Sequence, residues 1–316
     1  MVRYRSVFQD SARWDDFAFR DGDIVISTPP KSGTTWMQMI CALLVFGAPD
    51  VDRELDALSP WMDGLTQSHD SVLAALEAQQ HRRFIKTHVP LDGLPFDARA
   101  TYVCVGRDPR DVGISHRSHS ANMNVEAFLK ARESAVGPAD VGAFPSRAHT
   151  AQELSERDYF RRWMLDDRPV TESDATLIYT MHHLGTFWGA RNSANVVMVH
   201  YDDLKADLLG EMRRLAQRLG ITMPESAWPS LVRAATFDNM RKQAARLVPE
   251  AGRAIWRDRE RFFNRGVSRQ WVGVLDDADL REYAARVSEL AAPDLLGWVH
   301  RTPITTPSGA ARKEAG

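Results

Sequence analysis

The chain has 316 residues, 44% of them hydrophobic and 26% charged, an ordinary globular composition for one large α/β domain or two small ones. Its 40 basic and 42 acidic residues leave a net charge of −2, so no overall attraction draws it to nucleic acid or to an anionic membrane. Any bound anion must therefore be met by a local cluster of donors.

Four short apolar segments are each expected to form a strand. They are residues 24–27, 83–88, 101–106 and 195–201. Strands that are nearly all apolar and alternate with helices form a parallel sheet covered on both faces. The sequence therefore predicts an α/β fold, a P-loop-like three-layer sandwich with a central parallel sheet flanked by helices. Ligands of such sheets bind at the carboxyl ends of the strands. The loops that should converge on one site follow Ser27, Ile85, Gly106 and Val199.

The helices after these strands have recognisable boundaries. Residues 36–46 have helical length after the first strand. After the third strand, Asp108 is expected to be the N-cap and Pro109 the first helical residue. Asp202 is interpreted as the N-cap after the fourth strand, and that helix should end at Gly220. Its apolar face is formed by Leu204, Leu208, Met212, Leu215 and Leu219.

Residues 122–176 differ in composition and periodicity from the rest of the chain. Prolines and charged residues surround several aromatics there with only weak periodicity, so the segment is interpreted as a lid or long insertion. Residues 241–270 are rich in arginine, and residues 304–316 are expected to form a frayed tail. No internal repeat or linker is recognisable, so residues 1–316 are expected to form a single domain that carries this lid.

The apolar segments are too short for a membrane span. The longest run, residues 39–48, is well below the roughly 20 residues that a membrane helix needs. The N-terminus has no apolar core of signal-peptide length. Cys41 and Cys104 lie inside apolar runs and are interpreted as buried thiols of a reduced protein. We therefore expect a cytoplasmic protein.

The stretch PPKSGTTWMQM, residues 29–39, looks like a phosphate-binding turn with its lysine displaced. In P-loop nucleotide binders the lysine follows the glycines, whereas Lys31 precedes Gly33. Gly33 lets the backbone approach a ligand, and the N–H groups of residues 32–35 at a helix start favour an anion. The simpler interpretation is a solvated lysine beside a threonine, Thr34 or Thr35, that only caps the helix.

This loop and five further motifs, in the same order along the chain, resemble those of the cytosolic-type sulfotransferase family, of which the chain would be a bacterial member. The first two are KSGTTW, residues 31–36, and the pair Arg107 and Ser115. The third, KTHVPLDGLP, is similar to the family's catalytic Lys-Thr-His segment. The others are VHYDDLKAD, ATFDNM and FFNRGVSRQW, and the resemblance covers roughly residues 22–120 and 177–290.

The resemblance implies 3′-phosphoadenosine 5′-phosphosulfate (PAPS) as donor, a hydroxyl or amine of a small-molecule acceptor, and adenosine 3′,5′-bisphosphate (PAP) as the other product. It implies that Lys31 and the backbone of residues 32–35 hold the 5′-phosphate, and that Lys31 neutralises charge on the bridging oxygen as its bond to sulfur breaks. Arg107, Ser115 and Arg265 would hold the 3′-phosphate. The implied donor contacts are Lys31, Ser32, Gly33, Thr34, Thr35, Trp36, Arg107, Ser115, Tyr201, Thr236, Phe237, Met240, Phe263, Asn264, Arg265 and Gly266.

His88 is expected to be the general base for in-line transfer. An imidazole of ordinary pKa, about 6.5, is suited to take the proton of the acceptor near neutral pH. Lys86 lies two residues earlier on the same face of a strand and can stabilise transition-state charge at the same centre. Pro60 and Trp61 resemble a family segment that lines the acceptor mouth, and aromatics there indicate an apolar or ring-bearing acceptor.

The resemblance also implies that Trp36 and Phe237 pack on the adenine, with Tyr201 nearby.

Some details depart from the family pattern. Asn264 stands in place of the first basic residue of the family's late Arg-Lys-Gly element, so one phosphate-contacting charge is missing. The dimer motif of vertebrate members is not recognisable, which leaves the oligomeric state open.

The histidines do not follow an established metal-binding pattern. His116 and His119 are three apart on one expected helix, and His182 adjoins His183, but no third ligand occurs at a matching spacing, so no metal is expected. Two other functions stay open, a Mg²⁺-dependent P-loop kinase or NTPase and a nucleotide-binding module without turnover. A lysine ahead of the glycine favours sulfuryl transfer over the first, and the Lys-Thr-His segment favours it over the second.

Overall fold

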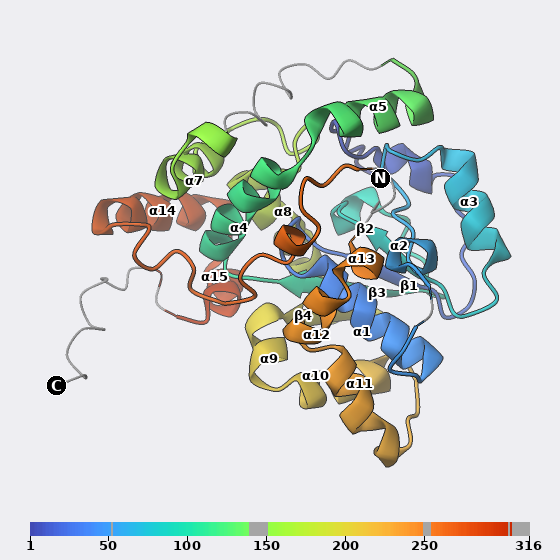
Figure 1. Cartoon of the computed structure of the whole chain (residues 1–316). Coiled ribbons are helices and arrows are strands. Elements are labelled where there is room, and N and C mark those ends of the chain that lie inside the picture. The colour runs from blue at the N-terminus through green and yellow to red at the C-terminus, as the bar shows by residue number, and fades with distance from the viewer. Residues whose placement is uncertain (52, 139–150, 249–253, 303, 305–316) are drawn as a thin grey trace.

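The protein has a central sheet of four parallel strands (Figure 1). The strands are β1, Ile24–Ser27, β2, Phe84–Thr87, β3, Thr101–Gly106, and β4, Val196–His200, in the order β2-β1-β3-β4. This computed structural model describes all residues except 52, 139–150, 249–253, 303 and 305–316. The predicted α/β class with a parallel sheet is confirmed.

Helices surround this sheet. The α-helices are α1, Thr34–Phe46, α2, Leu55–Leu58, α3, His69–Ala78, α4, Pro109–Asn122, α5, Val125–Val136, α7, Glu156–Met164, α8, Leu177–Gly189, α9, Tyr201–Ala206, α10, Leu208–Arg218, α11, Trp228–Ala234, α12, Phe237–Lys242, α13, Ala244–Leu247, α14, Asp277–Leu290, and α15, Pro293–His300. Short 3₁₀ turns lie at Ser11–Trp14, Leu91–Gly93, Glu225–Ala227 and Glu260–Phe262. Within the described ranges, no helix is both long and apolar enough to cross a membrane.

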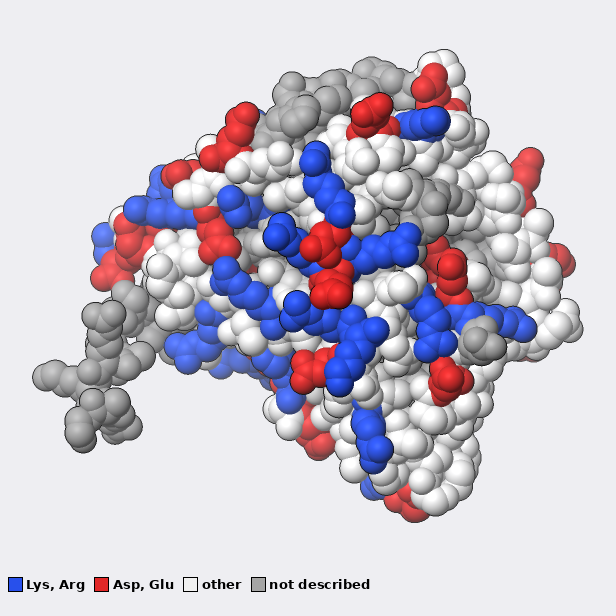
Figure 2. All heavy atoms as spheres, viewed as in Figure 1, with Lys and Arg blue, Asp and Glu red and all other residues white. Residues whose placement is uncertain are grey.

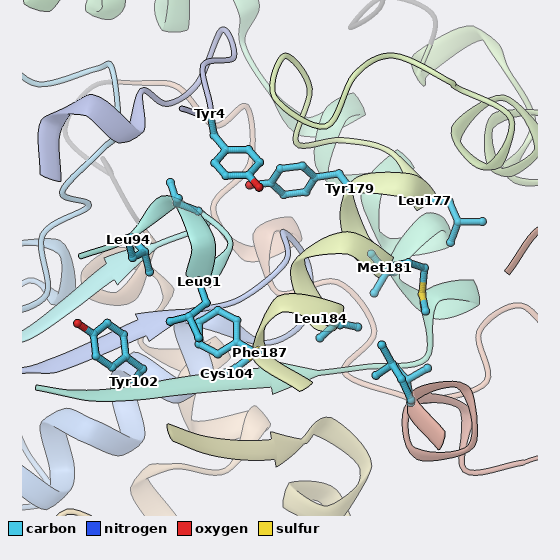
Figure 3. Close-up of a cluster of buried hydrophobic side chains, with 14 of the residues drawn as sticks. Tyr4, Leu91, Leu94, Tyr102, Cys104, Leu177, Tyr179, Met181, Leu184 and Phe187 are labelled. Atoms are coloured by element: carbon cyan, nitrogen blue, oxygen red, sulfur yellow. The ribbon is translucent and has the colours of Figure 1, made fainter. Parts of the chain in front are cut away.

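Two apolar clusters cover the two faces of the sheet, because alternate strand residues point to opposite sides. On one face, Val103 of β3 belongs to a cluster with Ile40 of α1 and Leu215 of α10. On the other, Cys104 of the same strand joins a cluster with Phe187 of α8, and Figure 3 shows that helix lying over the sheet. The helix, sheet and helix layers agree with the predicted three-layer sandwich.

The chain after β4 differs from the single helix that the sequence predicts. Two helices, α9 and α10, meet at Asp207, whose carboxylate caps α10 by accepting the N–H of Gly210 at 2.8 Å. The N-cap of α9 is His200, whose Nδ1 accepts the N–H of Asp202 at 3.1 Å. The interpretation of Asp202 as the N-cap was therefore wrong, because His200, two residues earlier, takes that position.

The segment interpreted as a lid contains the helices α5 and α7. Asp108 caps α4 as predicted, and Gly113 of α4 gives α7 close access, since a Cβ there would lie 2.7 Å from the ring of Phe160. Asn124 begins α5 by accepting the N–H of Ala127 at 3.3 Å. Residues 139–150 of this segment, and nearly all of the predicted tail, lie outside the described residues.

The arginine-rich region 241–270 contributes to a surface where both charges mix. Figure 2 shows basic side chains interleaved with acidic ones across the face that carries α12 and α13. Arg246 pairs with Asp50 at 3.2 Å, and Arg261 pairs with Asp258 at 3.3 Å. The local excess of arginine is thus partly neutralised by neighbours, in keeping with the balanced charge of the whole chain.

Candidate active site

A cavity opens at the carboxyl ends of the strands, where the loops after all four strands meet. Lys31 follows β1, His88 follows β2, Arg107 follows β3 and Tyr201 follows β4. The site residues predicted from the sequence that line it are Lys31, Gly33, Thr34, Thr35, Trp36, Trp61, Lys86, His88, Arg107, Ser115, Tyr201, Phe237, Met240, Phe263, Asn264 and Gly266.

Four predicted residues do not line the cavity: Ser32, Pro60, Thr236 and Arg265. The side chain of Ser32 is fully buried. Thr236 is the N-cap residue of α12, and its hydroxyl donates a hydrogen bond to the carbonyl of Arg233. The carbonyl of Pro60 accepts the N–H of Lys86 at 3.0 Å, which ties the mouth segment to β2. Arg265 is half-exposed and its guanidinium pairs with a glutamate of α7 at 3.1 Å, so the structure does not bring it to Arg107 and Ser115.

The loop after β1 depends on two residues with left-handed backbone. Lys31 has φ 70° and Gly33 has φ 107°. A Cβ at Gly33 would lie 3.1 Å from the ring of Tyr201, so glycine is needed both for conformation and for space. Gly33 is also the N-cap of α1, and no side chain caps that helix, so the interpretation of Thr34 as a mere cap is wrong. The first N–H groups of α1 therefore stay available to an anion in the cavity.

Lys31 lies among aromatic rings and a histidine. Its Nζ is 3.0 Å from Nδ1 of His119 and 5.1 Å from the ring centre of Phe262. Burial, with smaller contributions from Arg107 and Lys86, lowers the pKa of Lys31 to about 7. Burial also holds the pKa of His119 well below its usual range, so its neutral ring accepts a hydrogen bond from the ammonium. An anionic ligand would restore the full charge of Lys31.

The ring of His88 is held in one tautomer. Its Nδ1 donates to the carbonyl oxygen of Thr28 at 2.8 Å, which leaves the lone pair on Nε2. The carbonyl of His88 accepts from the hydroxyl of Tyr179 at 2.6 Å, which fixes the backbone as well. Burial, followed by the charge of Lys86, lowers the pKa of His88 to about 3, below the ordinary value assumed from the sequence. The imidazole is therefore neutral throughout the physiological range in the free protein, with the lone pair of Nε2 unprotonated.

Lys86 lies against the ring of Trp61, which the sequence analysis had assigned to the acceptor mouth and not to the support of this lysine. Its Nζ is 4.1 Å from the ring centre of Trp61, and the same ring meets His88 edge-on at 5.2 Å. The indole N–H of Trp61 donates to the carboxylate of Asp63, which also accepts from Trp14 at 2.7 Å and from a β2 threonine. Burial raises the pKa of Asp63 to about 6 against these hydrogen bonds. Asp63 thus fixes the orientation of the Trp61 ring that contacts Lys86.

Arg107 and the loop around residue 266 form the other wall of the same end. The guanidinium of Arg107 lies 4.4 Å from the ring centre of Tyr201. It donates hydrogen bonds to the carbonyls of Lys31 and Val267, each at 3.1 Å. Asp111 of α4 accepts the backbone N–H groups of residues 269 and 270 at 2.8 and 2.6 Å. This carboxylate, which the sequence analysis missed, holds the late loop against α4.

Aromatic rings flank these charged groups. The indole N–H of Trp36 donates to a carbonyl at 2.8 Å, and its ring meets that of Tyr201 edge-on at 5.3 Å. Phe237 packs on Gly266, where a Cβ would lie 2.6 Å from its ring. Phe263 lies 6.2 Å from Phe237. Planar groups beside fixed cations suit a purine nucleotide.

The other end of the cavity is mostly apolar and was not predicted from the sequence. It contains Phe8 from the N-terminal segment, Phe128 from α5, and Trp256 from the loop before α14. The rings of Phe8 and Phe128 are 5.0 Å apart, and Trp256 lies 4.5 Å from His119. The further lining residues at this end are Thr66, His116, Met123, Asp174 and Ile255. They come from separate segments, and no single stretch of the sequence marks them as one set.

The remaining histidines have structural partners. His183 lies 2.8 Å from the hydroxyl of Ser27, and His182 lies 2.6 Å from that of Tyr4. His116 lies 3.0 Å from the hydroxyl of Tyr159. In the part of the chain that the structure describes, no group of three His, Cys, Asp or Glu side chains could hold a metal ion.

Cations and aromatic rings that share a cavity with apolar residues suit an enzyme that transfers a group from an anionic nucleotide to a second, less polar molecule. One buried polar atom of the residues that line the cavity, Nε of Arg107, has no protein partner among the described residues. The N–H groups at the start of α1, this guanidinium and the lysines suit the phosphates of such a donor.

Comparison with known proteins gives the family. A sulfotransferase domain matches residues 21–292. A glycolipid sulfotransferase of Mycobacterium bovis (strain BCG / Pasteur 1173P2) is 43% identical over 307 residues, 95% of this chain and 94% of that relative. An amine sulfotransferase of Oryctolagus cuniculus is 27% identical over 243 residues, 75% of this chain and 67% of that relative. A mouse sulfotransferase complexed with PAP has a similar fold, with a TM-score of 0.66 and 19% identity over 92% of this chain and 93% of that one.

The chain therefore belongs to the sulfotransferase family. This membership confirms the predicted class of enzyme, a PAPS-dependent sulfotransferase, and disfavours the kinase and the non-catalytic module. The solved structure agrees with the fold seen here.

Proposed function

We propose that this enzyme transfers the sulfuryl group of PAPS to a hydroxyl of a glycolipid-type acceptor, with His88 as the general base. The observation that carries the proposal is the tautomer of His88, whose Nδ1–H is bound by the carbonyl of Thr28 while Lys31 and Lys86 line the same cavity. A proton acceptor thus lies between two cations that can stabilise charge on a leaving group.

The proposed reaction is an in-line displacement at sulfur. The acceptor oxygen forms a bond to sulfur as its proton passes to Nε2 of His88, and the bond between sulfur and the bridging oxygen breaks. The electron pair of that bond stays on the 5′-phosphate of PAP, where Lys31 and the N–H groups at the start of α1 receive the charge. Lys86, supported by Trp61, stabilises the sulfuryl oxygens in the transition state.

The donor is proposed to lie along the charged end of the cavity. Arg107 and Ser115 bind its 3′-phosphate, which gives the buried Nε of Arg107 a partner. Trp36 and Phe237 pack on the adenine, and Asn264 faces the same nucleotide. The other members of the donor set inferred by resemblance, including Arg265, stay predictions.

A glycolipid-type acceptor is supported by two observations. The relative that is 43% identical is a glycolipid sulfotransferase. The acceptor end of the cavity is apolar, with Phe8 and Phe128 side by side. Met123 and Phe128 come from residues 122–176, which supports the interpretation of that segment as a lid of a single domain. A cytoplasmic location is also proposed, supported by the two free buried cysteines.

Incubation with isotope-labelled PAPS and separate acceptors tests the proposal. The acceptors are a glycolipid, an alkyl glycoside, a phenol, a steroid and an alkyl amine, and the products are detected by mass spectrometry. The expected result is a sulfated glycoside or glycolipid formed faster than the other products. Sulfation of the amine alone, or the absence of any sulfated product, would contradict it.

A further inference from the structure

One carboxylate lies in the apolar end of the cavity, that of Asp174. Asp174 is only 6% exposed, lines the cavity and immediately precedes the segment in which Thr176 caps α8. Burying a carboxylate in a cavity that Phe8 and Phe128 also line is costly unless hydrogen-bond donors reach it. The proposed transfer chemistry does not use this group, so its presence needs another explanation.

The protein itself supplies few donors to Asp174. Its own backbone N–H and the hydroxyl of Ser6 each donate one hydrogen bond, and the guanidinium of Arg168 contributes only at a distance. Arg168 is engaged by Asp166, at 2.6 Å. Burial, aided by repulsion from Asp63, accordingly raises the pKa of Asp174 to about 6. Among the described residues no cation forms an ion pair with it, so acceptor lone pairs remain for a ligand.

The surrounding charges indicate which donors a ligand would bring. Lys31, Lys86 and Arg107 line the same cavity, so a cationic ligand would be repelled on entry. Neutral hydroxyl groups avoid this repulsion and can each donate a hydrogen bond to the carboxylate. Thr66 adds one further polar group at this end, and the adjacent aromatic rings can pack against the C–H face of a sugar or an alkyl chain.

We propose that Asp174 is a specificity-determining residue that accepts hydrogen bonds from ring hydroxyls of a sugar headgroup, while the apolar part of the acceptor lies on Phe8 and Phe128. This inference rests on the proposed function and narrows its acceptor to a glycoside with an apolar aglycone. The carboxylate orients the sugar, so that a neighbouring hydroxyl faces His88 in the same cavity.

Two matched ligands separate sugar recognition from general packing. Hexyl β-glucoside and 1-hexanol share an alkyl chain, and only the first has ring hydroxyls. The affinity of each is measured by calorimetry for protein saturated with PAP, and kcat/KM for each is measured with PAPS. The variants are Asp174→Ala, the nearly isosteric Asp174→Asn, and Glu172→Gln as a control at an exposed position of the same segment that does not line the cavity.

Asp174→Ala should weaken binding and kcat/KM for hexyl β-glucoside by roughly 10-fold to 100-fold, and Asp174→Asn by less, because a site built for hydroxyls loses its acceptor. Both should leave 1-hexanol within about threefold, and the control should leave both ligands unchanged. Equal losses for the two ligands would show that Asp174 only supports the structure. No loss for the glucoside, or an Asp174-dependent preference for hexylamine, would also overturn the inference.

The binding arm keeps this inference distinct from the proposed function. If the glucoside binds in an Asp174-dependent way but no sulfated product forms, the proposed function is wrong and the recognition of sugars stands. If the glucoside is sulfated equally well by Asp174→Ala, the function stands and the inference is wrong. If the wild type turns over 1-hexanol but neither binds nor sulfates the glucoside, the inference is wrong as well.

Discussion

The two ends of the cavity differ in how they are built and in what they can recognise. The donor end combines backbone N–H groups of α1 with cations that are themselves tied to the backbone, as Arg107 is to the carbonyls of Lys31 and Val267. The acceptor end consists of side chains from separate segments, such as Phe8 and Phe128, packed on one another. A backbone cradle tolerates few changes, because its geometry depends on φ angles, whereas a side-chain wall can change with single substitutions. The structure therefore joins a fixed donor site to an acceptor site that can vary.

His88 lines the cavity as the proposed general base, and its loss should have the largest effect. His88→Ala should lower the single-turnover rate by roughly two to four orders of magnitude, because the acceptor proton loses its base. The affinity for PAP should stay within about threefold, since the donor contacts lie elsewhere. Single-turnover kinetics and calorimetry measure the two quantities, with His81→Ala, which does not line the cavity, as the control. A near-normal rate in His88→Ala would remove this residue from the mechanism.

The donor end should distinguish PAP from adenosine 5′-phosphate through Arg107. Arg107→Ala should remove most of that preference, a loss of roughly 10-fold to 150-fold, because a charge-assisted contact to the 3′-phosphate disappears. Arg265→Ala should change the preference by about threefold or less, since its guanidinium faces Glu156 in this structure.

Calorimetric titration of both nucleotides against wild type and both variants measures the preference for PAP over adenosine 5′-phosphate. A loss for Arg265→Ala as large as that for Arg107→Ala would restore the 3′-phosphate role inferred for Arg265 from the family resemblance. A preference that survives in Arg107→Ala would place the 3′-phosphate elsewhere.

Binding of PAP should depend on pH through Lys31. Its pKa is lowered to about 7 in the free protein, chiefly by burial, and a bound phosphate favours the ammonium and raises that pKa. Between the two values binding takes up a proton, so the affinity should fall by up to about tenfold per unit as pH rises above 7, and should flatten below 7. Calorimetry over this range, with Lys31→Arg as a permanently charged control, measures the slope. A wild-type affinity that does not change above pH 7 would contradict a neutralised lysine.

The smallest predicted effect is a gain in affinity for PAP. Asn264 lines the donor end and donates only a long hydrogen bond, 3.3 Å, to Gln270. Asn264→Arg should strengthen PAP binding by roughly 3-fold to 10-fold and leave adenosine 5′-phosphate almost unchanged, because the added charge faces the 3′-phosphate. Asp238→Asn, at an exposed position of α12 that does not line the cavity, changes the net charge by the same unit and controls for charge alone. Equal gains for the two nucleotides would show a general electrostatic effect.

The sequence indicated the residues around Lys31 more completely than the apolar residues of the same cavity, for a physical reason. Lys31 and Gly33 belong to a contiguous loop whose conformation requires those residue types, so the motif is visible in a few letters. Phe8, Phe128 and Asp174 come together only through tertiary packing, and singly each resembles an ordinary core or loop residue.

Helix breaks and the environments of single side chains were also less predictable than the existence of the helices and strands. The strands and α1 lie close to their predicted ranges, because runs of β-branched residues and a long apolar helix leave little choice. The break between α9 and α10 at Asp207 was missed, since the apolar periodicity continues across it. The low pKa of His88 was also missed, because it depends on burial beside Lys86 rather than on local sequence.

The central claim, that this cavity transfers a sulfuryl group from PAPS with protein cations alone at the leaving group, is tested most directly by a single-turnover reaction in excess EDTA. Enzyme, labelled PAPS and hexyl β-glucoside are mixed, and PAP and the sulfated glycoside are quantified over time. The account predicts one PAP for each sulfated product, at a rate that EDTA does not change, because Lys31, Lys86 and the N–H groups of α1 take the place of a metal. A rate that is lost in EDTA and restored by Mg²⁺, or PAP release without any sulfated product, would contradict it.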